Sequence, residues 1–486
     1  MRTVAFHNLG CKVNTYEMEV MQQKFAEAGY EIVPFDSVAD VYVINTCSVT
    51  NIADHKSRQM LHKAKRRNPE SVVIAAGCYS QTDTEGAAAD DAVDIVLGNN
   101  RKAEITDVLE QYYISNKRPA DRQVSIVVDD LNKPSEYEDC AISESNERTR
   151  VDIKIQDGCD QFCSYCIIPA ARGRVRSRSK DSILEEIKTL ADKGYKEVVL
   201  TGIHLSSYGI DFASAGYDPA GSGSDAAGSD KHDGRSKYIP YNILTKDGDY
   251  TNKTLIDVIK SVASVKGIEK IRLGSLEPRV ITEEFVKAIS EIDKVCPHFH
   301  LSLQSGCDDT LKRMNRRYTA EEYYEKVKLL RKYYVNPAIT TDIIVGFPGE
   351  TEEEFAKTVD FTKRVNFYET HVFKYSKRKG TVAAGLPDQI TEAVKGIRSD
   401  VLLDICDKNR EAFLYAHIGN TVEILIEESR IIDGQAMLIG HTAEYMTAAI
   451  PTMSEDTSLS GGSILRGVAD SVYDGRMLIC RNLSGA

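Results

Sequence analysis

Residues 157–166, DGCDQFCSYC, carry three cysteines, Cys159, Cys163 and Cys166, in a single short stretch. Structural zinc sites usually take four ligands from two CxxC or CxxH pairs, and no fourth Cys or His adjoins this group. Three soft thiolates suit an iron–sulfur cluster with one iron left open. Three unrelated core cysteines are the alternative, although so dense a group is rare. The stretch therefore predicts a metal cluster held on a loop.

The loop follows the first of six predicted strands that alternate with helices. The strands are predicted at 152–155, 197–200, 270–273, 300–303, 339–345 and 370–373. The intervening helices are predicted at 182–193, 255–265, 282–292, 320–334 and 352–365. Each strand ends in a polar or glycine-bearing loop, and β/α barrels carry their chemistry at that end. Residues 150–380 are therefore expected to form a partial barrel of six β/α units with an active-site rim.

The flanking segments predict two further domains, giving an α/β multidomain fold. Residues 1–118 alternate strands at 3–7, 41–45, 72–75 and 94–97 with helices at 14–28, 54–67 and 102–115, as in a parallel α/β domain. Residues 119–149 are polar and acidic, as a linker would be. A connecting helix is expected within 381–417. Short strands at 422–427, 436–442, 445–450, 464–471 and 476–481 then predict a small antiparallel barrel over 418–486. Such a barrel often holds nucleic acid, although a packing or dimerisation module fits the same pattern.

An insertion interrupts the barrel after its second strand. Residues 211–234 are rich in Gly, Ala, Ser and Asp, and the irregular region runs to about 250. This composition buries too little apolar surface to offset the entropy of ordering. We expect a disordered expansion loop above the rim, with a lid as the alternative.

Composition and charge limit the possible partners. A chain of 486 residues suggests about three domains. The sequence lacks the pattern of a signal peptide or membrane span, which predicts a cytoplasmic protein with no membrane partner. The net charge of −12 argues against indiscriminate binding to polyanions. Lys and Arg nevertheless gather in four acid-free clusters, at 56–67, 172–180, 312–317 and 374–379. A basic face therefore remains possible.

The chain resembles the methylthiotransferases of the radical S-adenosylmethionine superfamily over nearly its full length, apart from the region 211–250. CxxxCxxC with Tyr165 before the third Cys is similar to the superfamily signature. GCKVNTYEME, INTCSVT and AAGCYSQ place Cys11, Cys47 and Cys78 after predicted strands, as in the family. Further family motifs are GSLEP, HLSLQSGCDDTLKRMNRRYT, TTDIIVGFPGETEEEF and FKYSKRKGT. The tail resembles the RNA-binding TRAM domain.

The resemblance implies two 4Fe–4S clusters and S-adenosylmethionine as cofactors. Cys159, Cys163 and Cys166 would hold one cluster, and Cys11, Cys47 and Cys78 the other. Residues implied to contact cofactor or substrate are Tyr165, Ser275, Glu277, Gln304, Ile344 and Gly346. Helix capping or an ordinary strand end explains several of these equally well. An electron donor such as a flavodoxin or ferredoxin is implied, whereas the sulfur donor is not identified.

The resemblance also implies a substrate, an adenosine in the anticodon loop of tRNA that is methylthiolated at C2. TGIHLSSYG with His204 looks closest to bacterial enzymes that modify N6-threonylcarbamoyladenosine. Isopentenyladenosine and a ribosomal-protein residue are alternatives, and a non-catalytic iron–sulfur RNA-binding protein is an alternative of another class. Phosphate contacts need Lys or Arg, and four arginines directly follow the cluster loop. We therefore expect RNA binding by Arg172, Arg174, Arg176 and Arg178.

Overall fold

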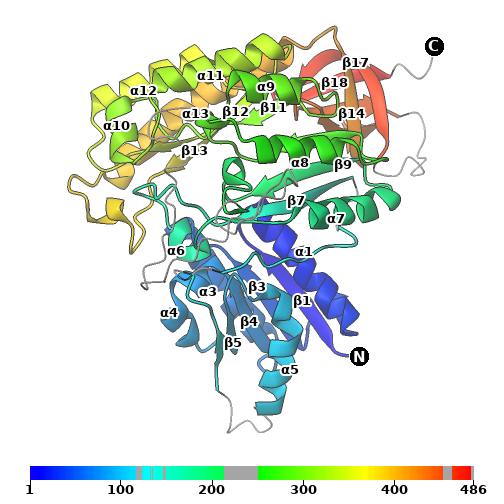
Figure 1. Ribbon diagram of the computed structural model, residues 1–486, viewed down its shortest axis with the longest axis vertical. Helices are drawn as coiled ribbons and strands as arrows, with labels where there is room; N and C mark the ends of the chain where they lie inside the picture. Colours follow the sequence, from blue (N-terminus) through cyan, green and yellow to red (C-terminus); the bar gives the residue numbers. More distant parts are fainter. Residues whose placement is uncertain are drawn as a thin grey trace, which may run out of the picture.

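The computed structural model describes residues 1–115, 123–131, 133, 135–145, 149–212, 250–452 and 462–482. A parallel sheet, a partial barrel and a closed barrel follow one another along the chain (Figure 1). The amino-terminal domain lies below the partial barrel in this view, and the carboxyl-terminal barrel, in red, lies beside it. This arrangement confirms the predicted fold class. The predicted insertion lies mainly outside the described residues.

The amino-terminal sheet has the strand order β2-β1-β3-β4-β5-β6, and every pairing in it is parallel. Its strands are β1 (Thr3–Asn8), β2 (Glu31–Val33), β3 (Val41–Thr46), β4 (Val72–Gly77), β5 (Ile95–Leu97) and β6 (Ser125–Val127). The main helices are α1 (Lys12–Glu27), α2 (Asn51–Arg67) and α5 (Ile105–Ser115). Val41 and Val43 pack into one apolar core, whereas Tyr42 and Ile44 pack into a second core. Because both faces are covered, the strands are continuous apolar runs.

The predicted linker is wrong in part, because the sheet continues past residue 118. β6 pairs in parallel with β5, with Ile95 opposite Ser125. Farther along, Ile142 is buried in the core of the barrel domain, and its N–H donates to Glu186 Oε1 at 2.6 Å. The apolar part of this segment is too short to stand out in an acidic sequence. The segment belongs partly to each domain.

The partial barrel has six parallel strands in two sheets. β7 (Arg150–Asp157), β9 (Glu197–Gly202) and β10 (Lys270–Leu273) share one sheet with the two-residue antiparallel strand β8 (Arg176–Ser177). β11 (His298–His300), β12 (Ala338–Val345) and β13 (Glu369–Lys374) form the other. Parallel bridges from Ile271 to Val295 and from Leu276 to Leu301 join the two.

Five helices cover the outer face of this barrel, with the main apolar core between them and the strands. They are α7 (Lys180–Asp192), α8 (Lys253–Ala263), α9 (Glu283–Ser290), α11 (Ala320–Tyr333) and α12 (Glu352–Val365). Capping boxes at Thr319 and Thr351 begin α11 and α12. The predicted strand at 300–303 is displaced, since β11 ends at His300. Beyond it, the carbonyls of Ser302 and Leu303 accept from the Tyr318 hydroxyl instead of joining the sheet ladder.

The carboxyl-terminal barrel follows the long helix α13 (Glu392–Tyr415). Its strands are β14 (Thr421–Ile432), β15 (Gln435–Thr442), β16 (Thr447–Pro451), β17 (Ile464–Tyr473) and β18 (Met477–Asn482). They close in the order β14-β15-β16-β18-β17. The pairings are antiparallel except for β16 with β18, which is parallel. Within the described part of the chain, no helix has the length and apolar character needed to span a bilayer.

Candidate active site at the mouth of the barrel

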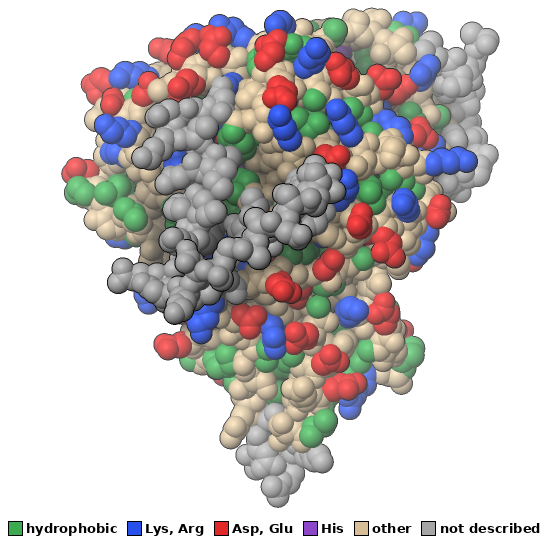
Figure 2. Space-filling view, viewed as in Figure 1, with side chains coloured by type: hydrophobic (Ala, Val, Ile, Leu, Met, Phe, Trp, Pro, Cys, Tyr) green, Lys and Arg blue, Asp and Glu red, His purple; other side chains and the backbone are tan. Residues whose placement is uncertain are grey.

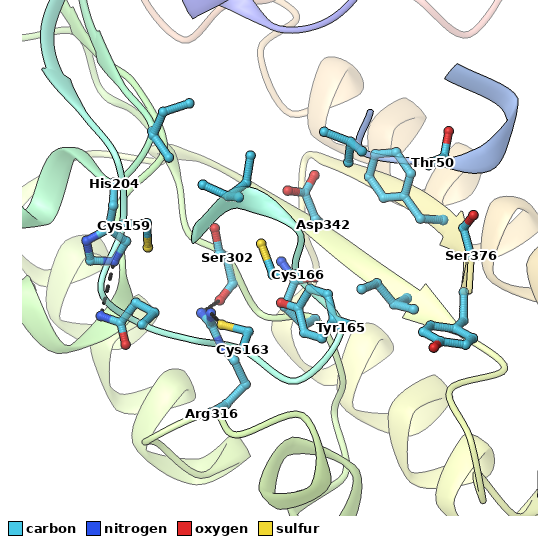
Figure 3. A pocket seen from close by; sticks show the side chains of 18 of the residues that line it. Thr50, Cys159, Cys163, Tyr165, Cys166, His204, Ser302, Arg316, Asp342 and Ser376 are labelled. Atoms are coloured by element: carbon cyan, nitrogen blue, oxygen red, sulfur yellow. Dashed lines mark hydrogen bonds between the residues drawn. The ribbon is translucent and has the colours of Figure 1, made fainter. Parts of the chain in front are cut away.

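A cavity of about 300 Å³ opens where the barrel strands end. Cys159, Cys163 and Cys166 line one side of it (Figure 3). Thr50 of the amino-terminal domain and Ser376, just after β13, line another part. The cavity therefore lies between the cysteine loop and the neighbouring domain.

The cysteine loop has a backbone that few other sequences could adopt. Gly158 has φ +71°, and a Cβ there would lie 1.8 Å from the carbonyl oxygen of Arg174. Burial raises the pKa of the Cys159 and Cys166 thiols, and that of Cys166 rises to about 12. The neighbouring Cys163 contributes to both of these shifts. Three adjacent thiols are thus costly to ionise without a cationic partner, and this donor set fits the predicted iron–sulfur cluster.

Arg316 is a site residue that the sequence did not single out. Its Nη1 donates to Cys163 Sγ at 3.3 Å, Nη2 donates to the Ser302 carbonyl at 3.2 Å, and Nε donates to the Tyr318 hydroxyl at 2.9 Å. All three nitrogens are therefore committed within the site. In the sequence Arg316 belongs to the basic cluster 312–317, where it looks like a surface residue.

The six predicted cofactor residues divide into two groups. Tyr165, Gln304 and Ile344 line the cavity, and Gln304 has the unusual φ of +74°. Ser275, Glu277 and Gly346 do not line it.

Those three residues have other surroundings. A Cβ on Gly346 would lie 2.3 Å from Lys395 Cγ, so this glycine makes room for α13. Ser275 is exposed. Glu277 is buried, and Arg279 Nε donates to its Oε1 at 2.7 Å. Its Oε2 has no hydrogen-bond partner among the described residues. Glu277 therefore retains an acceptor for a ligand.

His204 also lines the cavity. Its Nδ1 lies 2.6 Å from Ser207 Oγ, and its Nε2 lies 3.3 Å from Gln161 Nε2. Burial lowers the pKa of His204 to about 3, with smaller effects from Arg316 and Arg279. The ring is therefore neutral at physiological pH and can only exchange hydrogen bonds.

The second cysteine set lies at the carboxyl edge of the amino-terminal sheet. Cys47 and Cys78 directly follow β3 and β4, and Cys11 lies three residues after the end of β1; the three strands are parallel neighbours in the sheet. The pKa of Cys47 is raised to about 11, mainly by burial and in smaller part by the nearby Cys78 and Cys11. Asn99 Nδ2 lies 3.5 Å from Cys78 Sγ. Three thiols that influence one another in this way fit a second cluster.

Arg378 fixes the loop after Cys47 against the rim loop that follows β13. Its guanidinium donates to Ser48 Oγ and to Asn51 Oδ1, each at 2.7 Å, and pairs with Asp54. Ser376 Oγ accepts from the Asn51 N–H at 3.0 Å. The two domains therefore meet directly beside the cavity.

The RNA-binding prediction is wrong for three of the four arginines. Arg172, Arg176 and Arg178 are buried. Arg172 pairs with Glu17 and Asp157, Arg176 pairs with Asp157, and Arg178 pairs with Glu186 and Asp139. Arg172, through Glu17, and Arg178, which also donates to the Tyr16 hydroxyl at 3.2 Å, join the amino-terminal domain to the barrel. Arg176 pairs within the barrel.

Only Arg174 of the four is substantially exposed. Its side chain is 42% exposed, and its guanidinium lies 4.6 Å from the Phe162 ring centre. On the face shown in Figure 2, basic and acidic side chains alternate without a broad basic area. RNA contact by Arg174 stays a prediction.

Two family models match the chain. The model described as the radical SAM superfamily matches residues 153–362, which include the cysteine loop and most of the partial barrel. The model described as uncharacterized protein family UPF0004 matches residues 3–98, which include the second cysteine set.

Similar proteins match most of the chain. Threonylcarbamoyladenosine tRNA methylthiotransferase MtaB of Bacillus subtilis is 39% identical over 447 residues, 92% of this chain and 90% of the relative. MtaB of Aquifex aeolicus is 39% identical over 430 residues, 88% of this chain and 94% of the relative. The tRNA-2-methylthio-N(6)-dimethylallyladenosine synthase of Finegoldia magna is 34% identical over 432 residues, 86% of this chain and 82% of the relative. Among solved structures, the radical S-adenosylmethionine methyltransferase TsrM of Kitasatospora setae gives a TM-score of 0.48 at 14% identity, covering 77% of this chain and 73% of TsrM.

Proposed function

Because the chain belongs to the radical S-adenosylmethionine methylthiotransferase family, we propose that it adds a methylthio group to C2 of N6-threonylcarbamoyladenosine beside the anticodon of tRNA. Two relatives named for threonylcarbamoyladenosine are 39% identical to it, and two others with that name are 35% and 30% identical, whereas relatives named for dimethylallyladenosine are 34–35% identical. The observation that carries the proposal is the pair of cysteine sets, one beside the cavity and one on the adjoining edge of the neighbouring domain. Family membership favours an enzyme over a non-catalytic RNA-binding protein.

Enzymes of this superfamily use a 4Fe–4S cluster with S-adenosylmethionine, and Cys159, Cys163 and Cys166 are the ligands that we assign to it. When bound, these groups supply a radical able to attack an unactivated C–H bond. We propose that Cys11, Cys47 and Cys78 hold a second 4Fe–4S cluster, which would carry the sulfur that is transferred. In our proposal Tyr165, Gln304 and Ile344 form walls for the cofactor.

We propose that the rest of the chain delivers the base to this cavity. A splayed-out adenine in a loop is easier to place in a cavity than a paired one. The neutral His204 can orient a polar group there without adding charge. We propose that the carboxyl-terminal barrel and Arg174 contact the tRNA, and that a flavodoxin or ferredoxin supplies electrons. We place the enzyme in the cytoplasm, where tRNA is modified.

Nucleoside analysis of a deletion strain tests the proposed substrate. We expect 2-methylthio-N6-threonylcarbamoyladenosine to disappear from total tRNA while its precursor accumulates. Mass spectrometry of digested tRNA measures both, and complementation with the intact gene should restore the modified nucleoside. Persistence of that nucleoside, with loss of the isopentenyl analogue, would assign the enzyme to the other tRNA substrate.

Arg316→Met is expected to make the barrel cluster harder to reduce. A donor to a cluster thiolate stabilises the more negative reduced state, and a hydrogen bond to a charged group contributes about 1.5–3 kcal/mol. If the reduced cluster loses about 1.5 kcal/mol more stabilisation than the oxidised cluster, the one-electron reduction potential becomes about 60 mV more negative. A redox titration followed by electron paramagnetic resonance measures this shift, with Cys11, Cys47 and Cys78 replaced by alanine so that one cluster remains. Arg317→Met, at the exposed neighbouring position, should leave the potential unchanged; an equal shift there would contradict the prediction.

A further inference from the structure

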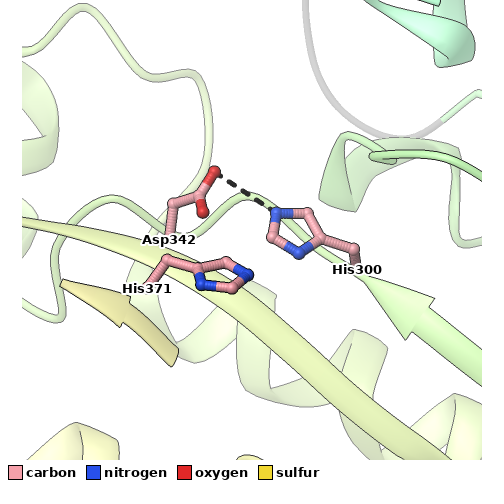
Figure 4. Close-up of side chains that lie close together, drawn as sticks. All are labelled: His300, Asp342 and His371. Atoms are coloured by element: carbon pink, nitrogen blue, oxygen red, sulfur yellow. Dashed lines mark hydrogen bonds and ion pairs between the residues drawn. The ribbon is translucent and has the colours of Figure 1, made fainter. Parts of the chain in front are cut away.

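Three polar side chains that belong to neither cysteine set converge on the inner wall of the barrel. His300 lies on β11, Asp342 on β12 and His371 on β13, which are neighbouring strands. His300 Nε2 lies 3.3 Å from Asp342 Oδ2, and the His300 and His371 rings stack with centres 6.0 Å apart (Figure 4). One polar atom from each residue lies within 4.8 Å of the other two. The three can therefore contact a single small polar group.

This group adjoins the cavity of the cysteine loop. Asp342 lines that cavity together with Cys159, Cys163 and Cys166. Its side chain is 28% exposed, and His371 is also exposed. A ligand in the cavity therefore meets Asp342 first, with the two imidazoles beyond it.

Lys12 adds a positive charge on the side of Tyr445 and His298. It follows Cys11, and its ammonium lies 5.7 Å from the ring centre of Tyr445, which comes from the carboxyl-terminal barrel. The Tyr445 ring in turn lies 5.2 Å from the ring of His298, two residues before His300 on β11. Burial lowers the pKa of His298, and the nearby charges of Arg272, Lys12, His300 and His371 add to that effect. Within the described ranges the Lys12 ammonium forms no hydrogen bond and no ion pair within 4.0 Å; Asp152 is the acid whose charge acts on it most strongly. Lys12 is exposed, so within those ranges its ammonium is a cation without a close anionic partner that a ligand can reach.

We propose that Lys12, His300, Asp342 and His371 form the binding site for the N6 substituent of the target adenosine. This inference rests on the proposed function. Lys12 and His371 donate hydrogen bonds to the threonyl carboxylate, and Asp342, oriented by His300, accepts one from its hydroxyl or N–H.

The chemistry of the base supports this placement. C2 and N6 of adenine flank N1 on one edge, so a base with C2 toward the cysteines directs its N6 substituent along the adjoining wall. The threonylcarbamoyl group offers an anion and polar hydrogens to that wall. An isopentenyl group offers neither, so the hydrogen-bonding atoms of this wall would find no partner in the substrate. Enzyme sites built to hydrogen-bond a polar group reject apolar analogues by such a mismatch.

The test uses the reconstituted enzyme with three anticodon stem–loops. They carry threonylcarbamoyladenosine, its neutral carboxamide analogue or isopentenyladenosine. We expect kcat/KM for the wild type to be about 10- to 100-fold higher for the acid than for the amide, the effect of a hydrogen bond to a charged group. In Lys12→Met and in His371→Phe the acid-to-amide ratio should fall toward one. Lys63→Met is the matched control, because the Lys63 ammonium also lies 5.7 Å from a ring centre, that of Phe35, and its ratio should not change.

The outcomes separate the inference from the proposed function. Iron content and cleavage of S-adenosylmethionine without tRNA show whether each variant retains its clusters, and His371→Phe is the decisive variant if Lys12→Met loses iron beside Cys11. The inference is overturned, and the proposed function is not, if the wild type has equal kcat/KM for the acid and the amide. The same holds if both variants keep the wild-type acid-to-amide ratio. A stoichiometric divalent ion that is lost in His371→Phe also overturns the inference, since the three side chains would then be metal ligands. A wild type that modifies only the isopentenyl stem–loop overturns the proposed function as well.

Discussion

Replacement of Cys159, Cys163 and Cys166 by alanine is expected to reduce formation of 5′-deoxyadenosine to background and to remove about half of the iron. These three thiols are the only protein ligands that we assign to the barrel cluster, so without them no site remains for S-adenosylmethionine. The matched replacement of Cys11, Cys47 and Cys78 should also remove about half of the iron. That variant should still form 5′-deoxyadenosine but yield no methylthiolated nucleoside. Iron analysis and chromatography of the nucleoside products measure both results.

Cys480→Ala is the control for the loss of buried thiols. Cys480 is fully buried in the core of the carboxyl-terminal barrel, away from both cysteine sets. Its removal should leave iron content and both products unchanged and cost about 1 kcal/mol of stability. Methylthiolated product from the variant without Cys11, Cys47 and Cys78 would contradict the role assigned to the second set. Undiminished 5′-deoxyadenosine from the variant without Cys159, Cys163 and Cys166 would contradict the role assigned to the first set.

The architecture could be predicted because its strands are regular and long enough to produce a pattern. β3 and β4 are buried at every position, and buried parallel strands appear in a sequence as continuous apolar runs. β6 and β8 have three and two residues, which is too few for any periodicity. The parallel pairing of β16 with β18 depends on barrel closure, and no local feature of the sequence encodes it.

The site could be predicted only where its chemistry is local. Cys159, Cys163 and Cys166 stand together, so their spacing alone indicates a cluster. The function of a charged residue depends instead on distant partners, as Arg172 shows: its partner Glu17 lies 155 residues earlier in the chain. Arg378 likewise binds Asp54 across 324 residues. Both belong to acid-free clusters that look like surface patches until folding brings the acids to them.

The network around Glu17 gives the second large expected effect, a loss of stability. Glu17 is buried between the two domains and binds Lys154 Nζ and Arg172 Nη1, each at 2.7 Å, as well as Lys102. Glu17→Gln keeps the shape but leaves these three buried cations with one anion fewer. Breaking a buried ion pair from one side costs about 3–5 kcal/mol. Urea unfolding followed by circular dichroism should show a loss of this size at neutral pH.

The pH dependence of this loss separates charge from shape. Burial opposes ionisation of Glu17, but Arg172, Lys102 and Lys154 outweigh it and hold the pKa well below its usual range. Since the unfolded pKa is near 4.3, ionised Glu17 stabilises the fold fully above that pH, and the contribution is lost as the pH falls toward the folded pKa. The difference between wild type and Glu17→Gln should therefore be largest above about pH 5 and shrink on acidification. Glu27→Gln, at the exposed end of the same helix, should cost less than about 0.5 kcal/mol, because its pairing with Lys24 is screened by water. A Glu17→Gln loss that does not vary with pH would show that packing, not charge, holds the two domains together here.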